Sequence, residues 1–343
     1  MKLDIQEAKK ILDKIQVASY NDPTKPEFPF EDPKFPATPT YQIQVPWFSN
    51  VWLKDESYNP TWTHKDRMAW EIIVSYKDIL KTAQKSTSWK IDLPHMSLIS
   101  SGSAALAIQT ALQHFHLPHL KVLMDHGTNP WIMESLEALW AEVYLTDLSK
   151  QILKSTDILQ QTHNVQGIDI TSADALDPNT RFYDWLSYEI INTDPQRCFV
   201  PFGTGVLYEN LLSVAKKELS EHRESDPRFT GNKNIIKSCH YIWWTTNNPN
   251  SQATKLYSPY LPFSHFDEQW LKIYKYAWYC GEYSNVYIIR ENLLEQALQI
   301  LRSQGVSIEP SAAAWLALLL QMKKQIPSDD KILIVSTGNT KWK

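Results

Sequence analysis

The segment Pro60-Thr61-Trp62-Thr63-His64-Lys65-Asp66-Arg67 is the most informative part of the chain, and it follows Leu53-Lys54-Asp55-Glu56. It opens a predicted helix over residues 65–80, so Lys65 stands at the helix start. The helix dipole and burial both disfavour the charged form of a lysine there, which lowers its pKa. A neutral lysine amine can attack an aldehyde and form a Schiff base. Taken alone, Lys65 fits a solvated surface residue better, so the other motifs must decide.

A serine-rich motif, Ser100-Ser101-Gly102-Ser103-Ala104-Ala105, lies between a predicted strand and a predicted helix. Such a turn directs several backbone N–H groups and hydroxyls toward one point, which suits a carboxylate. Plain N-capping of the helix by Ser101 or Ser103 is the simpler explanation when this motif is taken alone.

A glycine motif, Phe202-Gly203-Thr204-Gly205-Val206-Leu207, also leads from a predicted strand into a predicted helix. Glycine is scarce, with nine in the chain, so it is expected where the backbone demands it. The turn can cradle a phosphate at the helix start. It is neither a P-loop nor a dinucleotide fingerprint, because the lysine of the first and the third glycine of the second are missing.

The last motif, Ser336-Thr337-Gly338-Asn339-Thr340-Lys341, follows the final predicted strand directly. A hydroxyl at this place can hydrogen-bond a buried heteroaromatic nitrogen. Taken alone, the motif is better explained as a C-terminal turn without any such role.

Strands and helices are predicted to alternate along most of the chain, which indicates open parallel sheets with helices on both faces. We expect two α/β lobes with a cleft between them. The smaller lobe, residues 46–157, carries Lys65, and the larger lobe combines 1–45 with 158–343. Predicted strands cover 41–45, 51–54, 96–100, 121–124, 142–145, 198–202, 234–242, 285–289 and 331–335, and predicted helices cover 65–80, 104–114, 130–140, 208–218, 291–304 and 311–323.

The composition argues against several functions. The 343 residues are enough for two packed lobes, and 43% hydrophobic with 21% charged residues is ordinary for a soluble globular protein. The net charge is −4 and no basic block is interleaved with aromatics, so nothing indicates a nucleic-acid surface. The longest apolar run, Ala312–Leu320, is too short to span a membrane.

The N-terminal segment and the cysteines fit a cytoplasmic protein. Residues 1–20 carry charges that interrupt any apolar run, so an amphipathic helix is expected rather than a signal peptide, followed by a proline-rich arm over 21–39. Cys198, Cys239 and Cys280 form no metal or redox pair motif, which fits reduced thiols.

In order and spacing, the four motifs resemble those of fold-type II pyridoxal-phosphate enzymes, the family of threonine synthase, cysteine synthase and the tryptophan synthase β chain. Threonine synthase is the nearest pattern, with its Pro-Thr-Gly-Ser-Phe-Lys-Asp-Arg, Ser-Gly-Asn, Gly-Thr-Gly-Gly and terminal Thr-Gly motifs. Glu309-Pro310-Ser311-Ala312-Ala313 and Ser251-Gln252-Ala253-Thr254-Lys255-Leu256 have family counterparts too. The resemblance runs from about residue 38 to 341.

The resemblance implies the cofactor pyridoxal 5′-phosphate, a homodimer, and elimination or replacement at the β or γ carbon of an amino acid. Lys65 would hold the cofactor and carry the α-proton. The implied cofactor contacts are Lys65, Ser103, Gly203, Thr204, Gly205, Val206, Leu207 and Thr337, with Ser311 as a second candidate for the ring nitrogen. The implied substrate contacts are Thr61, Ser100, Ser101 and Gly102.

Several residues depart from the family pattern: Trp62 and Val206 replace glycines, Ser103 replaces an asparagine, and Thr63 and His64 replace a serine and a phenylalanine. A catalytically degenerate member that binds the cofactor or a partner without turnover is therefore an alternative. A nucleotide-binding α/β protein is a third possibility, but it does not explain the lysine motif.

Three other features are assigned no role in the reaction. His114, His116 and His119 do not supply four convergent ligands, so a surface helix end is expected rather than a metal site. Asp125-His126-Gly127 fits a plain turn better than a substrate loop. Tyr241-Ile242-Trp243-Trp244 fits the end of a buried strand, and a lid is the alternative.

Overall fold

The protein is described by a computed structural model that covers residues 37–86, 94–171, 182–222, 224–246, 248–257, 284–305 and 308–339. The helix predicted over 1–20 and most of the proline-rich arm lie outside these residues. The chain forms two compact units. Unit 1 contains Asn59–Phe182, and unit 2 contains Thr38–Tyr58 and Tyr183–Asn339.

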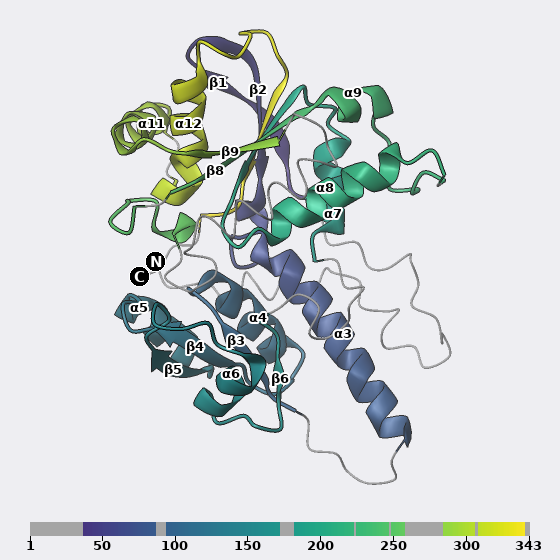
Figure 1. Ribbon diagram of the computed structural model, residues 1–343, viewed down its shortest axis with the longest axis vertical. Helices are drawn as coiled ribbons and strands as arrows, with labels where there is room; N and C mark the ends of the chain where they lie inside the picture. The colour runs from purple at the N-terminus through teal and green to yellow at the C-terminus, as the bar shows by residue number, and fades with distance from the viewer. Residues whose placement is uncertain are drawn as a thin grey trace. The chain divides into compact units, whose positions relative to one another are not determined.

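Unit 2 is built on a six-stranded sheet with the order β1-β2-β10-β7-β8-β9 (Figure 1). All neighbouring pairs are parallel except β1 with β2. The parallel strands therefore end at one common edge. The strands are β1 (Thr40–Val45), β2 (Phe48–Asp55), β7 (Arg197–Pro201), β8 (His240–Thr245), β9 (Ser284–Ile288) and β10 (Ile332–Ser336).

Helices cover both faces of this sheet: α11 and α12 on one, α7 and α8 on the other (Figure 1). Neighbouring residues of β8 show the division, because Trp243 stacks on Tyr208 of α8 while Trp244 joins the core around α12. The helical elements of unit 2 are α7 (Asp184–Ile191), α8 (Val206–Leu219), α9 (Lys233–Ser238), α11 (Glu291–Ser303), α12 (Pro310–Met322) and the 3-10 turns η1 (Glu56–Tyr58) and η2 (Thr254–Leu256).

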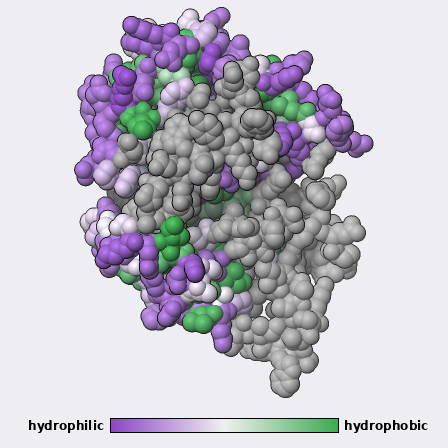
Figure 2. Space-filling view, in the orientation of Figure 1, coloured by the Kyte–Doolittle hydropathy of each residue, from purple (hydrophilic) through white to green (hydrophobic). Residues whose placement is uncertain are grey.

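The core of unit 2 lies under α12, in which every residue from Ser311 to Leu320 is buried. α11 is amphipathic instead: Leu294, Ala297, Leu298 and Leu301 face the core at helical spacing. Its outer surface is mainly hydrophilic (Figure 2). α11 is thus the outer helix of this layer and α12 the inner one.

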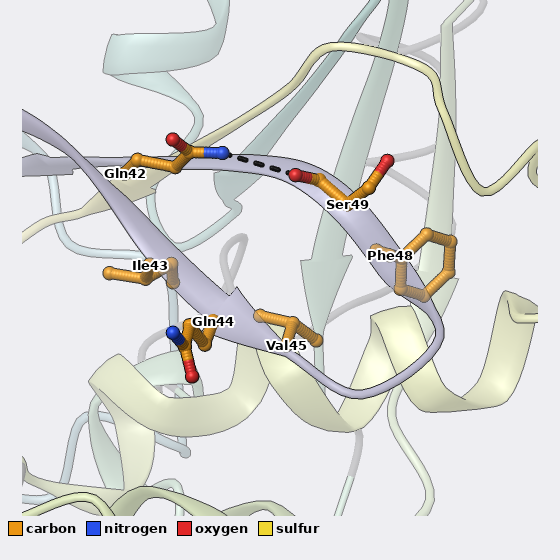
Figure 3. Close-up of a pocket in the computed structure, with 6 residues that line it drawn as sticks. All are labelled: Gln42, Ile43, Gln44, Val45, Phe48 and Ser49. Atoms are coloured by element: carbon orange, nitrogen blue, oxygen red, sulfur yellow. Dashed lines mark hydrogen bonds between the residues drawn. The ribbon is translucent and has the colours of Figure 1, made fainter.

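A cavity of about 400 Å³ lies at the β1–β2 hairpin (Figure 3). The amide of Gln42 donates to the carbonyl of Ser49 across it, at 3.1 Å. The hairpin turn precedes the parallel part of β2, so this cavity is at the opposite edge of the sheet from the carboxyl ends of the strands. Its lining is Gln42, Ile43, Gln44, Val45, Phe48 and Ser49, which contains no titratable group.

Unit 1 has a four-stranded, wholly parallel sheet with the order β5-β4-β3-β6. The long helix α3 packs against α4, with Ala69, Ile72, Ile73 and Tyr76 buried along one face at helical spacing. The elements are α3 (Lys65–Ser86), β3 (Met96–Ile99), α4 (Ser103–His114), β4 (Lys121–Asp125), α5 (Pro130–Glu137), β5 (Glu142–Thr146), α6 (Ser155–Gln161) and β6 (Ile168–Asp169).

The predicted α/β class with parallel sheets is confirmed, and several details differ. The strand predicted over 234–242 is wrong, because Lys233–Ser238 forms α9 and the strand begins at His240. Asn232 initiates this helix by accepting the N–H of Asn234 at 2.9 Å. β2 pairs with β10, so Phe48–Asp55 belongs to unit 2, whereas the predicted lysine-bearing lobe began at residue 46.

Candidate functional site

The turn before α3 is held by a dense set of hydrogen bonds. Asn59 accepts the N–H of Trp62 at 2.9 Å and its amide donates to the carbonyl of Thr63 at 3.1 Å. The buried carboxylate of Asp66 accepts both the N–H of Thr61, at 2.8 Å, and its hydroxyl, at 2.8 and 2.9 Å. The start of α3 is therefore fixed by side chains on both sides of the turn.

Lys65 is the first residue of α3 and is half-buried. Its N–H donates to the hydroxyl of Thr63 at 3.3 Å. Burial lowers the pKa of its amine to about 8. A larger fraction of this amine is thus uncharged at neutral pH than for an ordinary lysine, which is what attack on an aldehyde needs.

The serine turn joins β3 to α4 in the same unit. The buried hydroxyl of Ser100 accepts the N–H groups of Gly102, at 3.0 Å, and Ala105, at 3.3 Å. Gly102 has φ 127, in the region that favours glycine. The expected capping of α4 by Ser101 or Ser103 is not what the structure shows, since Ser100 makes this contact. Ser101 is exposed and Ser103 half-buried.

The glycine turn joins β7 to α8 in unit 2. Gly205 precedes the helix with φ 84, a left-handed conformation that a residue with a Cβ rarely adopts. Val206 begins the helix and avoids positive φ, as expected for a branched residue. The first N–H groups of α8 have no partner within the helix, and the helix dipole favours an anion there. Gly203 and Leu207 flank this helix start, with Thr204 exposed between the glycines.

The carboxyl edge of the unit 2 sheet brings further hydroxyls near this turn. β10 neighbours β7, so Thr337 follows β10 at the edge where the glycine turn follows β7. The buried hydroxyl of Ser311 accepts the N–H of Lys255 at 3.1 Å, which leaves its own proton free to be donated. The carbonyl oxygen of Lys255 lies 4.0 Å from where a Cβ on Gly203 would stand.

Lys255 and Glu309 form a pair that was not among the predicted site residues. Their charged groups are 2.7 Å apart. The pKa of Glu309 lies above its ordinary value, because burial raises it by more than the neighbouring Lys255 lowers it. The pair connects η2 to the start of α12, and so fixes the backbone that borders Ser311. Both residues belong to motifs that have family counterparts. The spacing of those motifs does not indicate that Lys255 and Glu309 form an ion pair.

Both units contain predicted site residues. Unit 1 holds Lys65 and the serine turn, and unit 2 holds the glycine turn, Ser311 and Thr337. Thr61, a predicted substrate contact, is buried and donates both its N–H and its hydroxyl to Asp66. An amine with a lowered pKa fits an aldehyde, the start of α8 fits a phosphate, and a neutral hydroxyl fits a ring nitrogen. This donor set fits pyridoxal phosphate.

Three other expectations concern residues away from this donor set. Within the described residues, no group of three histidine, cysteine or acidic side chains could hold a metal ion. His119 instead stacks on Trp140, and His114 on Phe115. The sequence over 240–245 is a buried strand, β8, rather than a lid. None of the helices in the described ranges is long and apolar enough to span a membrane.

Comparison with known proteins agrees with the cofactor. The sequence model of a family described as pyridoxal-phosphate dependent enzymes matches residues 35–338. A search of curated proteins finds no match.

Solved structures show the same fold. O-ureido-L-serine synthase is 14% identical, over 89% of each chain, with a TM-score of 0.58. Diaminopropionate ammonia lyase from Escherichia coli, in apo form, is 13% identical over 98% of this chain and 87% of that one, with a TM-score of 0.61. The processed form of threonine deaminase isoform 2 from Solanum lycopersicum is 18% identical over 86% and 80%, with a TM-score of 0.54. Identities this low establish the fold alone.

Proposed function

The chain belongs to the family of pyridoxal-phosphate-dependent enzymes, and we propose that it catalyses elimination or replacement at the β or γ carbon of an amino acid. The observation that carries this proposal is Lys65, an amine with a lowered pKa at the start of α3. Such an amine can hold the cofactor covalently and, once released from it, carry a proton to or from the substrate.

Each of the other residues has a part in the proposal. The N–H groups of the glycine turn, from Gly203 to Leu207, hold the phosphate. Ser101 and the neighbouring N–H groups orient the substrate carboxylate. When bound, pyridoxal phosphate supplies an electron sink for the charge left on the α carbon. Ser311 or Thr337 faces the ring nitrogen with a neutral hydroxyl, which does not force that nitrogen to be protonated and so suits elimination and replacement.

The names of the similar structures support this reaction class. They include a synthase of a substituted serine, an ammonia lyase and a deaminase. Within the class, the order of the sequence motifs resembles that of threonine synthase most, and the resemblance alone does not name the substrate. A homodimer, implied by the same resemblance, and a cytoplasmic location, favoured by the unpaired cysteine pattern, complete the proposal.

The test is to load purified protein with pyridoxal phosphate and add amino acids that have a β or γ leaving group. Suitable probes are L-serine, L-threonine, O-acetyl-L-serine and O-phospho-L-homoserine. Wild type should release a keto acid with ammonia, or form a replacement product with an added nucleophile, and Lys65→Ala should do neither. A protein that binds the cofactor and responds to none of these amino acids would contradict the proposal and favour the catalytically degenerate alternative.

A further inference from the structure

Trp62 has a backbone conformation that a tryptophan rarely adopts. Its φ is 58, in the left-handed region, and its side chain is half-buried. Bulky residues at positive φ are outliers, and such strain persists only where the surroundings impose it. Here Asn59 holds this conformation with two hydrogen bonds: its carbonyl accepts the N–H of Trp62, and its side-chain amide donates to the carbonyl of Thr63.

The turn around Trp62 has few N–H groups left for a ligand. The N–H of Thr61 goes to Asp66, that of Trp62 to Asn59, and that of Lys65 to Thr63. The N–H groups of Asp66 and Arg67 are also used, by the carbonyls of Thr63 and His64. A phosphate would therefore find little of the backbone hydrogen bonding that it needs.

One side-chain donor of the same turn is also unavailable to a phosphate. The hydroxyl of Thr61 is already donated to Asp66, whose buried carboxylate would repel a second anion. The turn also carries the half-buried indole of Trp62, three residues before the lysine that the proposed function uses. An indole offers apolar area and excludes volume.

We propose that Trp62 is a specificity-determining residue, and that it limits the substrate to amino acids with a small side chain that carries no phosphate. This inference rests on the proposed function, because it concerns the substrate of the same site. It disfavours O-phospho-L-homoserine, and with it the threonine synthase reaction, within the proposed class. The strained backbone is then the cost of keeping a large ring at this point.

The test compares wild type with Trp62→Gly, both loaded with pyridoxal phosphate. Each is titrated with L-serine and with O-phospho-L-serine while the visible absorption of the bound cofactor is followed. Wild type should bind L-serine the more tightly. The measured quantity is the dissociation constant for O-phospho-L-serine divided by that for L-serine. In Trp62→Gly this ratio should fall by roughly tenfold or more, the discrimination that one misfit contact typically provides.

Trp140→Gly is the matched control. Trp140 lies in the same unit and also has positive φ, 72, but it is exposed beyond α5. Replacing it relieves similar strain, so the ratio of dissociation constants should stay at the wild-type value. Trp62→Leu, which has a smaller side chain, should lower the ratio part of the way, and it decides the question if the glycine variant does not fold.

An unchanged ratio in Trp62→Gly overturns this inference, and so does a wild type that binds O-phospho-L-serine as tightly as L-serine. A wild type without any visible band from bound cofactor overturns the proposed function instead. The two failures are therefore distinguishable in one experiment.

Discussion

Lys65 titrates in a range where its protonation state decides its reactivity. Burial lowers the pKa of its amine from 10.5 to about 8. Between these two values the unfolded chain binds more protons than the folded one, so the contribution of Lys65 to stability rises with pH over that window. Below about pH 8 the cost of burying the charged amine is fully present.

The lowered pKa of Lys65 predicts how fast the apoprotein takes up its cofactor at different pH. Only the neutral amine attacks the aldehyde, so the rate should rise about tenfold per pH unit below pH 8 and level off above it. The growth of visible absorption after mixing measures this rate. A profile that keeps rising to about pH 10 would show an ordinary, solvated lysine.

Gly205 and Gly203 offer a comparison within one turn. Gly205 has φ 84, whereas Gly203 lies outside the left-handed region, and a methyl group added to it would meet only one atom within 4 Å, at 4.0 Å. Gly205→Ala should lower the free energy of unfolding by about 1–2 kcal/mol, and Gly203→Ala by no more than about 0.5 kcal/mol. Urea unfolding of the two apoproteins measures the difference, and equal losses would contradict the argument from φ.

At the scale of the element, the carboxylate of Asp66 is one of the groups that fix the start of α3. Asp66 accepts the N–H and the hydroxyl of Thr61, and all of these groups are buried. Asp66→Ala should therefore lower the free energy of unfolding by about 1.5–3 kcal/mol, the usual value of hydrogen bonds to a charged group. Asp66→Asn keeps an acceptor for Thr61 and should lose less than half as much. The account fails if the alanine variant is as stable as wild type in thermal unfolding.

Elements with regular apolar spacing could be predicted from the sequence, and several others could not, of which α9 and α7 show why. The face of α3 that carries Ile72, Ile73 and Tyr76 is buried as its spacing indicates. The residues of α9 include adjacent isoleucines, which favour a strand, but the cap at Asn232 starts a helix instead. α7 was missed because its aromatic and β-branched residues are weak helix formers, and packing against α8 stabilises it.

At the scale of the whole molecule, the sheet of unit 2 depends on a segment far away in sequence. Lys54 of β2 is 1% exposed, pairs with Glu189 of α7, and donates to the carbonyl of Thr38 at 2.6 Å. Its neighbour Glu56 accepts the hydroxyl of Thr38 at 2.5 Å. Residues 38–56 are thereby joined to α7, which lies more than a hundred positions later in the sequence, after the segment that forms unit 1.

Lys54→Met should lower the free energy of unfolding by about 3–5 kcal/mol, because it takes this partner from the largely buried carboxylate of Glu189. Adding Glu189→Leu should recover most of the loss, since replacing both charges removes the uncompensated one. Chemical unfolding of the two variants and wild type measures both effects. A double variant no more stable than the single one would show that the charges are not coupled.

The site could be predicted from the sequence only as far as its motifs extend. Their order predicts the lysine, the serine turn and the glycine turn as parts of the site. The strained φ of Trp62 and the Lys255–Glu309 pair could not be predicted, because they arise from a hydrogen-bonded turn and from packing between distant segments. The capping role of Ser100, rather than of Ser101 or Ser103, follows from the same kind of local geometry.

The most direct test of the central claim is to find which lysine carries the cofactor. Purified protein loaded with pyridoxal phosphate is reduced with borohydride, which fixes the bond to the amine, and its peptides are mapped by mass spectrometry. The account predicts a pyridoxyl group on the peptide that contains Lys65, and none on those that contain Lys54 or Lys255. A modified lysine elsewhere, or no modified lysine in protein that is folded, would contradict it.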